Sequence, residues 1–103
     1  MYIYNVTIHL DESVQEDWLR WMRDIHIPEM LATGKFSKAL MTRVMVEEEM
    51  GGFTFSVQYT TDSKETLDKY YAEDAERLRS RGTARFGGKF MAFRTELAIV
   101  SEH

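Results

Sequence analysis

The sequence predicts an α+β fold in which two amphipathic helices cover one face of a four-stranded antiparallel sheet. Apolar and polar residues alternate along residues 2–10 and 53–60, as they do in strands with one buried face. After each of these stretches, apolar residues recur every three to four positions, which is typical of helices. A chain of 103 residues has room for one core only, so we expect a single domain over residues 1–103.

The first strand is expected over Tyr2 to Leu10, followed by a helix that begins at an S-x-x-E capping box, Ser13 to Glu16. Pro28 lacks a backbone donor and disfavours helical geometry at the residue before it. We therefore expect the helix to end near His26 and a separate short helical turn to run from Pro28 to Thr33. The apolar stripe of the first helix consists of Val14, Trp18, Trp21, Met22 and Ile25.

The central part of the chain predicts a β-hairpin. A strand is expected over residues 35–48, and Met50-Gly51-Gly52 supplies the positive φ angles of a tight turn. The next strand follows from Phe53, and its apolar set should face the helices because large side chains gain free energy from burial. The residues placed on one side of the first hairpin strand are Phe36, Leu40, Val44 and Val46, and those of the second are Phe53, Phe55, Val57 and Tyr59.

The last part of the chain predicts a second helix and a fourth strand. Asp62 and Glu65 form a capping pair, and the helix should run to about Arg81, before Gly82. Its apolar stripe consists of Leu67, Tyr71, Ala75 and Leu78. With a strand over residues 89–100, the order is β-α-β-β-α-β, which permits a ferredoxin-like arrangement with both helices on one face of the sheet.

The other face of the sheet has no covering element, so we expect a second copy of the chain to cover it. Small chains gain stability from burying a further layer, and closed two-fold dimers are the commonest homo-oligomers. Such an interface should bury at least about 1,200 Å², with Arg43 or Arg94 meeting an acidic or carbonyl partner. The residues expected on this face are Asn5, Thr7, His9, Met41, Arg43, Ser56, Gln58, Arg94 and Glu96.

Three segments carry a resemblance to a known family: YNVTIHLDESVQEDWLRWMRDIHIPEMLATGKF, GGFTFSVQYT and RFGGKFMAFRTEL. With their W-x-x-W-M and H-I-P motifs, they resemble a small bacterial family of unknown function that is similar to the dimeric α+β barrel superfamily. The resemblance covers nearly the whole chain. It implies that two sheets pair face to face into a barrel, with a small pocket between the helices and the sheet of each subunit.

The resemblance also bears on activity, because some members of that superfamily are cofactor-independent monooxygenases or haem degraders. Several of these enzymes carry an asparagine on the first strand, a tryptophan and a histidine. Asn5 matches the asparagine, and His26 could stand near a pocket. The third strand of this chain has no tryptophan and the second helix no histidine, which departs from the haem-degrading pattern.

Composition excludes several classes of function. A formal net charge of −4 argues against non-specific binding to nucleic acid. The chain has no cysteine, which excludes thiolate chemistry and fits a reducing cytoplasm, the expected location. The N-terminal run lacks the features of a signal peptide, and no apolar run reaches the ~18 residues of a membrane span. The three histidines lack metal-ligand spacing, so we expect neither a metal nor a cofactor.

Some residues allow both a structural and a functional interpretation. The tryptophan stripe has the spacing of a core, yet two indole N–H groups are hard to satisfy in a dry interior. His26, the catalytic candidate, is either a helix C-terminal histidine or a general base. Asp74 falls within the apolar stripe of the second helix and forms either an ion pair or a pocket acid.

Charged residues near the C-terminus raise similar alternatives. Arg94 and Glu96 share one face of the last strand and form either an exposed pair or contacts in a dimer interface. Four arginines, Arg77, Arg79, Arg81 and Arg85, cluster near the end of the second helix. They offset the helix dipole there, and an anion site is the alternative.

Two functions from different classes follow. The first is a site for a small, largely apolar or aromatic molecule, between the first helix and the sheet of each subunit, used for binding or for monooxygenase-like catalysis. The second is a structural or interaction module with a filled core. A cavity of roughly 300 Å³ or more would favour the ligand. The residues expected to line the site are Tyr4, Trp18, Trp21, Met22, His26 and Tyr59.

Overall fold

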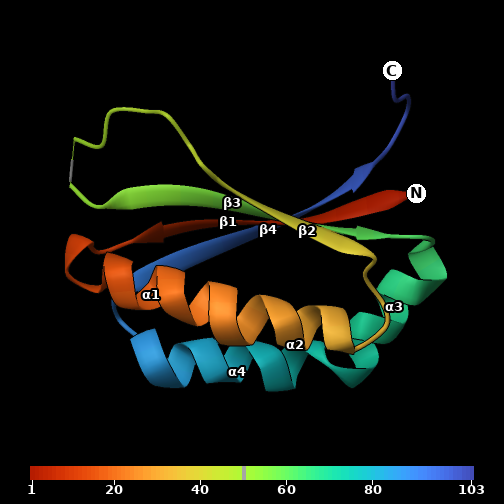
Figure 1. Ribbon diagram of the computed structural model, residues 1–103, viewed down its shortest axis with the longest axis horizontal. Helices are drawn as coiled ribbons and strands as arrows, with labels where there is room; N and C mark the ends of the chain where they lie inside the picture. Colours follow the sequence, from red (N-terminus) through yellow and green to blue (C-terminus); the bar gives the residue numbers. More distant parts are fainter. Residues whose placement is uncertain (50) are drawn as a thin grey trace.

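The computed structural model describes residues 1–49 and 51–103 and has the predicted element order. Its strands are β1 (Tyr2–Leu10), β2 (Lys38–Arg43), β3 (Phe53–Thr61) and β4 (Phe90–Ala98). They form one antiparallel sheet in the order β2-β3-β1-β4, so that β2 and β4 are its edges. Figure 1 shows every helix on one side of this sheet. The predicted ferredoxin-like α+β fold is therefore confirmed.

The first helix does not end near His26, and this prediction was wrong. The backbone stays helical through α1 (Gln15–Trp21), the π-helical segment η2 (Met22–His26) and α2 (Ile27–Ala32). The N–H of Ile27 donates to the carbonyl of Met22, five residues back. A π turn changes which carbonyl lies opposite each N–H, so it can accommodate Pro28, which has no N–H and whose ring would otherwise clash with a carbonyl of the preceding turn.

Both predicted caps also differ from the structure. A 3₁₀ turn, η1 (Glu12–Val14), precedes α1, and Asp11 caps it by accepting a bond from the N–H of Ser13. The second helix begins after Ser63, whose hydroxyl accepts a bond from the N–H of Thr66. The oxygen that satisfies free N–H groups of the first turn lies two residues before the predicted Ser13 in the first helix and one residue after the predicted Asp62 in the second.

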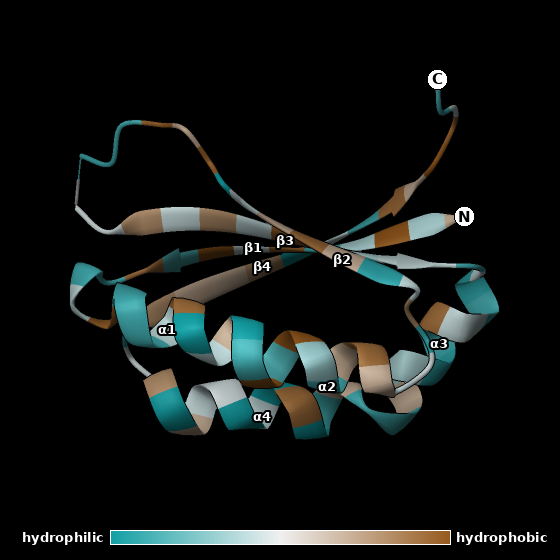
Figure 2. Cartoon of the chain, in the orientation of Figure 1, coloured by the Kyte–Doolittle hydropathy of each residue, from teal (hydrophilic) through white to brown (hydrophobic). Residues whose placement is uncertain are grey.

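The second helix is interrupted once and is longer than predicted. It consists of α3 (Lys64–Glu73) and α4 (Ala75–Phe86), and the backbone leaves helical geometry at Asp74. Gly82 does not end the helix but lies inside α4. At this position the absence of a side chain leaves room for the ring of Trp21. The core between the helices and the sheet contains aromatic and aliphatic residues of both layers. Figure 2 shows that hydrophobic and hydrophilic residues alternate along the helices and strands that contribute to it.

The register of the sheet decides which side chains face the helices. Phe55, Val57 and Tyr59 are buried against them, as predicted. The strand predicted over residues 35–48 is shorter, and it is Ala39 and Met41, opposite Tyr59 and Val57, that pack against the core. Leu40 is 59% exposed on the other face, contrary to the prediction. Part of the predicted hairpin turn, Met50, lies outside the described residues; Gly51 and Gly52 have the expected positive φ angles.

Four residues predicted for the helix-free face lie on the opposite one. Arg94 pairs with Val6 and Glu96 with Tyr4, whose side chains face the helices, and Met41 and Arg43 likewise pair with Val57 and Phe55. These four cannot contribute to an interface on the helix-free face, so the predicted role of Arg43 or Arg94 there was wrong. The helix-free face, hereafter the open face, instead carries Leu40 from β2 and Met91, Phe93 and Leu97 from β4 beside the polar residues of β1 and β3.

Candidate functional site

A cavity of about 60 Å³ lies between the helices and the face of the sheet that they cover. Strands β1, β3 and β4 form one wall, and the helical segments α1, η2, α2, α3 and α4 form the opposite wall. All six residues that the sequence predicted for a site line this cavity: Tyr4, Trp18, Trp21, Met22, His26 and Tyr59. The volume is well below roughly 300 Å³, so in this conformation the cavity admits only a small molecule or one end of a larger one.

The π-helical segment explains why His26 reaches the cavity. In an uninterrupted α-helix, Ile25 would follow Trp21 on the buried face, four residues later. The wider π turn instead aligns residues five apart, and the His26 ring stacks on Trp21 with centroids 4.7 Å apart and planes 19° apart. Ile25 is 41% exposed as a result. Single π turns of this kind are frequent at functional sites.

His26 is held in its neutral form. Burial is the largest cause, and the charges of Arg81 and Arg94 act in the same direction, so that the pKa of His26 falls to about 4 although Glu29 opposes the change. Its Nδ1 is buried and has no hydrogen-bond partner among the described residues. At neutral pH the imidazole can therefore donate or accept one hydrogen bond without carrying charge, and it is a weak base.

Three tyrosines line the cavity, Tyr4 and Tyr59 from the sheet and Tyr70 from α3 (Lys64–Glu73). Tyr4 packs against Tyr70 with ring centroids 5.3 Å apart and against Tyr59 at 6.2 Å. Burial raises the pKa of Tyr59 and of Tyr70, so both hydroxyls stay protonated at neutral pH. These rings provide a rigid aromatic surface with a hydroxyl at its edge, a common means of binding a small molecule.

Two arginines complete the cavity lining, and the sequence analysis did not assign them to it. Arg79 lies on α4 and donates from Nη2 to the Tyr4 hydroxyl at 2.8 Å. Arg94 reaches the cavity from the helix-facing side of β4. Among the described residues, neither forms an ion pair with a carboxylate, and the buried Nε of Arg79 has no hydrogen-bond partner. The arginine cluster was the signal that pointed to Arg79.

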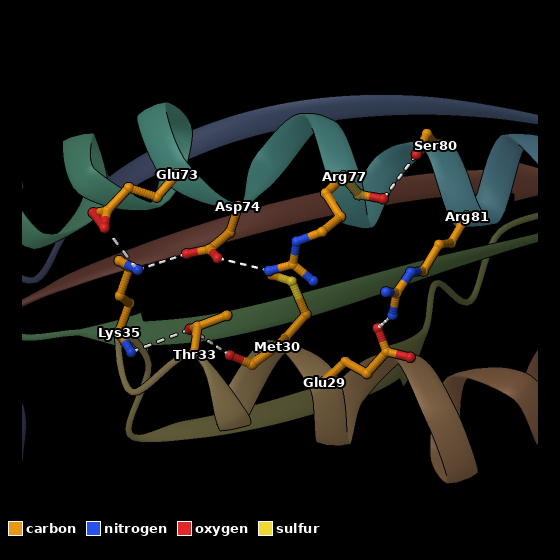
Figure 3. A network of polar contacts seen from close by, with 9 residues as sticks. All are labelled: Glu29, Met30, Thr33, Lys35, Glu73, Asp74, Arg77, Ser80 and Arg81. Atoms are coloured by element: carbon orange, nitrogen blue, oxygen red, sulfur yellow. Dashed lines mark hydrogen bonds and ion pairs between the residues drawn. The ribbon is translucent and has the colours of Figure 1, made fainter.

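Asp74 lies outside the cavity and forms an ion pair, one of the two alternatives considered for it. It accepts from Lys35 Nζ at 2.6 Å and from Arg77 at 2.8 Å, and these partners extend toward its carboxylate in Figure 3. The bond from Lys35 is the main cause that lowers the pKa of Asp74. In the same view Arg81 pairs with Glu29 on α2. These contacts join the helical segments.

Asn5, which matches a superfamily asparagine, does not reach the cavity. Its Oδ1 accepts a bond from the Ser56 hydroxyl at 2.6 Å, and its Nδ2 donates to Thr7. All three residues lie on the open face, so Asn5 and His26 are on opposite sides of the sheet. Among the described residues, no group of three or more His, Cys, Asp or Glu side chains could hold a metal ion. Within that same part of the chain, no helix is long and apolar enough to cross a membrane.

A family model described as a domain of unknown function, DUF4286, matches residues 1–100. The chain belongs to this family. A search of curated proteins found no match for this DUF4286 member. Its fold recurs in solved structures of low sequence identity, which establish likeness of fold alone.

Three of these structures indicate the range of proteins with this fold. A dimeric ferredoxin-like protein from an uncultured marine organism is 14% identical with a TM-score of 0.72, over 99% of this chain and 97% of that one. A mutant of MhuD with two manganese protoporphyrin IX molecules bound per active site is 10% identical with a TM-score of 0.70, over 100% and 98%. An ethyl tert-butyl ether D family protein from Bacillus halodurans is 13% identical with a TM-score of 0.63, over 92% and 97%.

Proposed function

We propose that this chain, as a single domain of residues 1–103, forms a homodimer in which each subunit binds one small molecule in its cavity. Tyr4, Trp18, Trp21, Met22, His26 and Tyr59 would contact the ligand. The aromatic walls provide apolar contact area, and His26 provides a neutral hydrogen-bonding group. The proposal is one of binding and includes no reaction. A cytoplasmic location stays a prediction.

The observation that carries the binding proposal is a pair of buried nitrogen atoms, His26 Nδ1 and Arg79 Nε, that have no hydrogen-bond partner in the part of the chain that the structure describes. Both residues line the cavity. A buried polar group without a hydrogen bond costs about 1–3 kcal/mol, which a purely structural core avoids by using apolar residues. A ligand with hydrogen-bonding atoms would recover part of this cost.

The alternative is an interaction module whose interior serves only stability. The small cavity volume favours this alternative, because pockets for drug-sized ligands usually exceed about 300 Å³. Under it, no compound should stabilise the protein through the cavity, and filling the cavity should be neutral or favourable.

Two alanines on edge strands allow a matched test. Ala92 of β4 and Ala39 of β2 both lie on the helix-facing side and pack against the core, but only Ala92 lines the cavity. Thermal shifts with a library of small aromatic and aliphatic compounds are measured for the wild type, Ala92→Leu and Ala39→Leu. We expect ligand-induced stabilisation to be lost in Ala92→Leu and kept in Ala39→Leu. Equal shifts in all three proteins, or none in the wild type, would refute the binding proposal.

The open face is the proposed dimer interface. Phe93 and Met91 are each 60% exposed, and Leu40 on the opposite edge strand is 59% exposed, so an apolar surface flanks the polar centre of the sheet. Two proteins with this fold are described as dimeric, and in Figure 1 the helices lie on one side of the sheet and leave its other face uncovered. Pairing two such faces would bury apolar side chains from both edge strands of each copy.

Light scattering at micromolar concentration tests the interface. Phe93→Glu places a charge within the open face and should convert the dimer to a monomer, since burying an unpaired charge and losing an aromatic contact are both costly in an interface. Ile25→Glu is the matched control, because Ile25 is also an exposed apolar residue but lies on the helical layer. A monomeric wild type, or a Phe93→Glu variant that dimerises as well as the wild type, would contradict the proposal.

A further inference from the structure

We infer that the cavity selects a small organic carboxylate, which Arg79 and Arg94 bind directly. This inference rests on the binding function proposed above and adds the chemical class of the ligand. It comes from the charges around the cavity rather than from its aromatic walls. Two arginines line the same cavity from opposite layers, Arg79 from α4 and Arg94 from β4.

The acidic residues near the cavity are already paired with other cations. Glu29 pairs with Arg81, and Glu96 accepts bonds from Lys64 and Tyr71. Asp74 pairs with Lys35 and Arg77. The chain has 17 acidic and 13 basic side chains, so acidic residues are numerous enough for Arg79 and Arg94 each to have a carboxylate partner. Among the described residues none does so, although Glu96 lies only two positions from Arg94 on the same face of β4.

The setting of Arg79 suits direct contact with an anion. Arg79 is partly buried, and the Tyr4 hydroxyl accepts one of its N–H groups, which orients the guanidinium. Its Nε, one of the donors that form a fork matching a carboxylate, has no partner among the described residues. Bonds between a guanidinium and a carboxylate are often bidentate and about twice as strong as neutral ones.

The remaining lining fits the organic part of such a ligand. Trp21 and Phe86, which both line the cavity, meet edge to face with centroids 5.5 Å apart and provide apolar contact area. Neutral His26 adds a hydrogen bond without repelling an anion or competing for the arginines as a carboxylate would. The volume of about 60 Å³ is under half that of a ~150 Å³ cavity known to bind benzene, which limits a ligand that enters without movement of the walls to the shortest carboxylates. A ring would require the aromatic walls to shift.

Calorimetry with matched pairs of ligands tests the inference. The probes are sodium acetate, butyrate and benzoate, and the corresponding uncharged amides. We expect at least one carboxylate to bind at least tenfold more tightly than its amide, because the amide cannot form the charge-assisted pair. We also expect the affinity to fall as salt concentration rises, since Arg94 is exposed to solvent.

Each arginine has a matched control elsewhere in the chain. Arg43 resembles Arg94, because it lies on the helix-facing side of the other edge strand and forms no ion pair among the described residues, and it does not line the cavity. Arg85 is the control for Arg79, because both lie on α4 and Arg85 does not line the cavity. Arg79→Gln and Arg94→Gln should each weaken carboxylate binding about tenfold or more. Arg43→Gln and Arg85→Gln should leave it unchanged.

A second readout follows from the position of His26. A bound carboxylate adds negative charge near the imidazole, so NMR titration should find the pKa of His26 higher with the carboxylate than without it. Amides that bind as tightly as carboxylates would overturn the charge selection and leave the binding function standing. If neither the carboxylates nor the amides bind, both the proposed binding function and the selection of a carboxylate would be overturned. Equal losses in the arginine variants and their controls would show that the arginines do not contact the ligand.

Discussion

Mild acid should destabilise this protein through protonation of His26. The pKa of a histidine in an unfolded chain is about 6.5, and burial lowers it to about 4 in the folded protein. The unfolded chain therefore binds the proton more readily than the folded one. Stability is fully present above pH 6.5 and is lost progressively as the pH falls to about 4, below which His26 causes no further change.

The structure sets the size of this effect. Each pH unit between the two pKa values corresponds to about 1.4 kcal/mol, which gives an upper limit of about 3.5 kcal/mol. His26 is only half-buried, and solvent screening reduces the effect, so we expect about 1–2 kcal/mol between pH 7 and pH 4. Asp74 acts in a lower range, because its pKa lies below the ordinary value of 3.8.

Urea unfolding at fixed protein concentration between pH 7 and pH 4 measures the effect. His26→Phe keeps a ring that can stack on Trp21 but cannot be protonated, so its stability should fall less with acid than that of the wild type. His9→Gln is the control, since His9 lies on the open face beside Thr54 and Glu48. Identical pH dependence in the wild type and His26→Phe, or a His26 pKa near 6.5 by NMR, would refute the reasoning.

Two further predictions concern the helical layer. Asp74→Asn should lower the free energy of unfolding by about 2 kcal/mol, because the side chain of Lys35 is only 16% exposed and would lose its nearer charged partner, at 2.6 Å, and keep only Glu73 at 3.8 Å. Asp68→Asn breaks an exposed pair and should cost less than about 1 kcal/mol; equal losses in urea unfolding would contradict this. Gly82→Ala should stabilise α4 by up to about 1 kcal/mol, while its added carbon, 3.4 Å from Trp21 Cη2, narrows the cavity. A higher melting temperature together with weaker ligand binding is the expected result, and unchanged binding would argue against ligand contact at Trp21.

The sequence by itself determined the element order and the pattern within strands. Side chains alternate along any extended backbone, so Phe55, Val57 and Tyr59 share one face whatever surrounds them. Their apolar character then selects the buried face. Helical spacing likewise identified Trp18, Trp21 and Met22 as inward-facing, which is why the predicted site residues do line one cavity.

Only the tertiary structure decided features that depend on partners. Alternation shows that Arg94 and Glu96 share a face but not which face, and pairing with Tyr4 and Val6 turned them toward the helices. Apolar spacing does not show where a helix changes from an α turn to a π turn. The π-helical segment that stacks His26 on Trp21 was therefore not predicted. Charged side chains usually lie in solvent, and local patterns cannot reveal when packing directs one into a cavity. Arg79 and Arg94 reach the same cavity only because α4 and β4 lie on opposite sides of it, a contact between distant segments that no local rule contains.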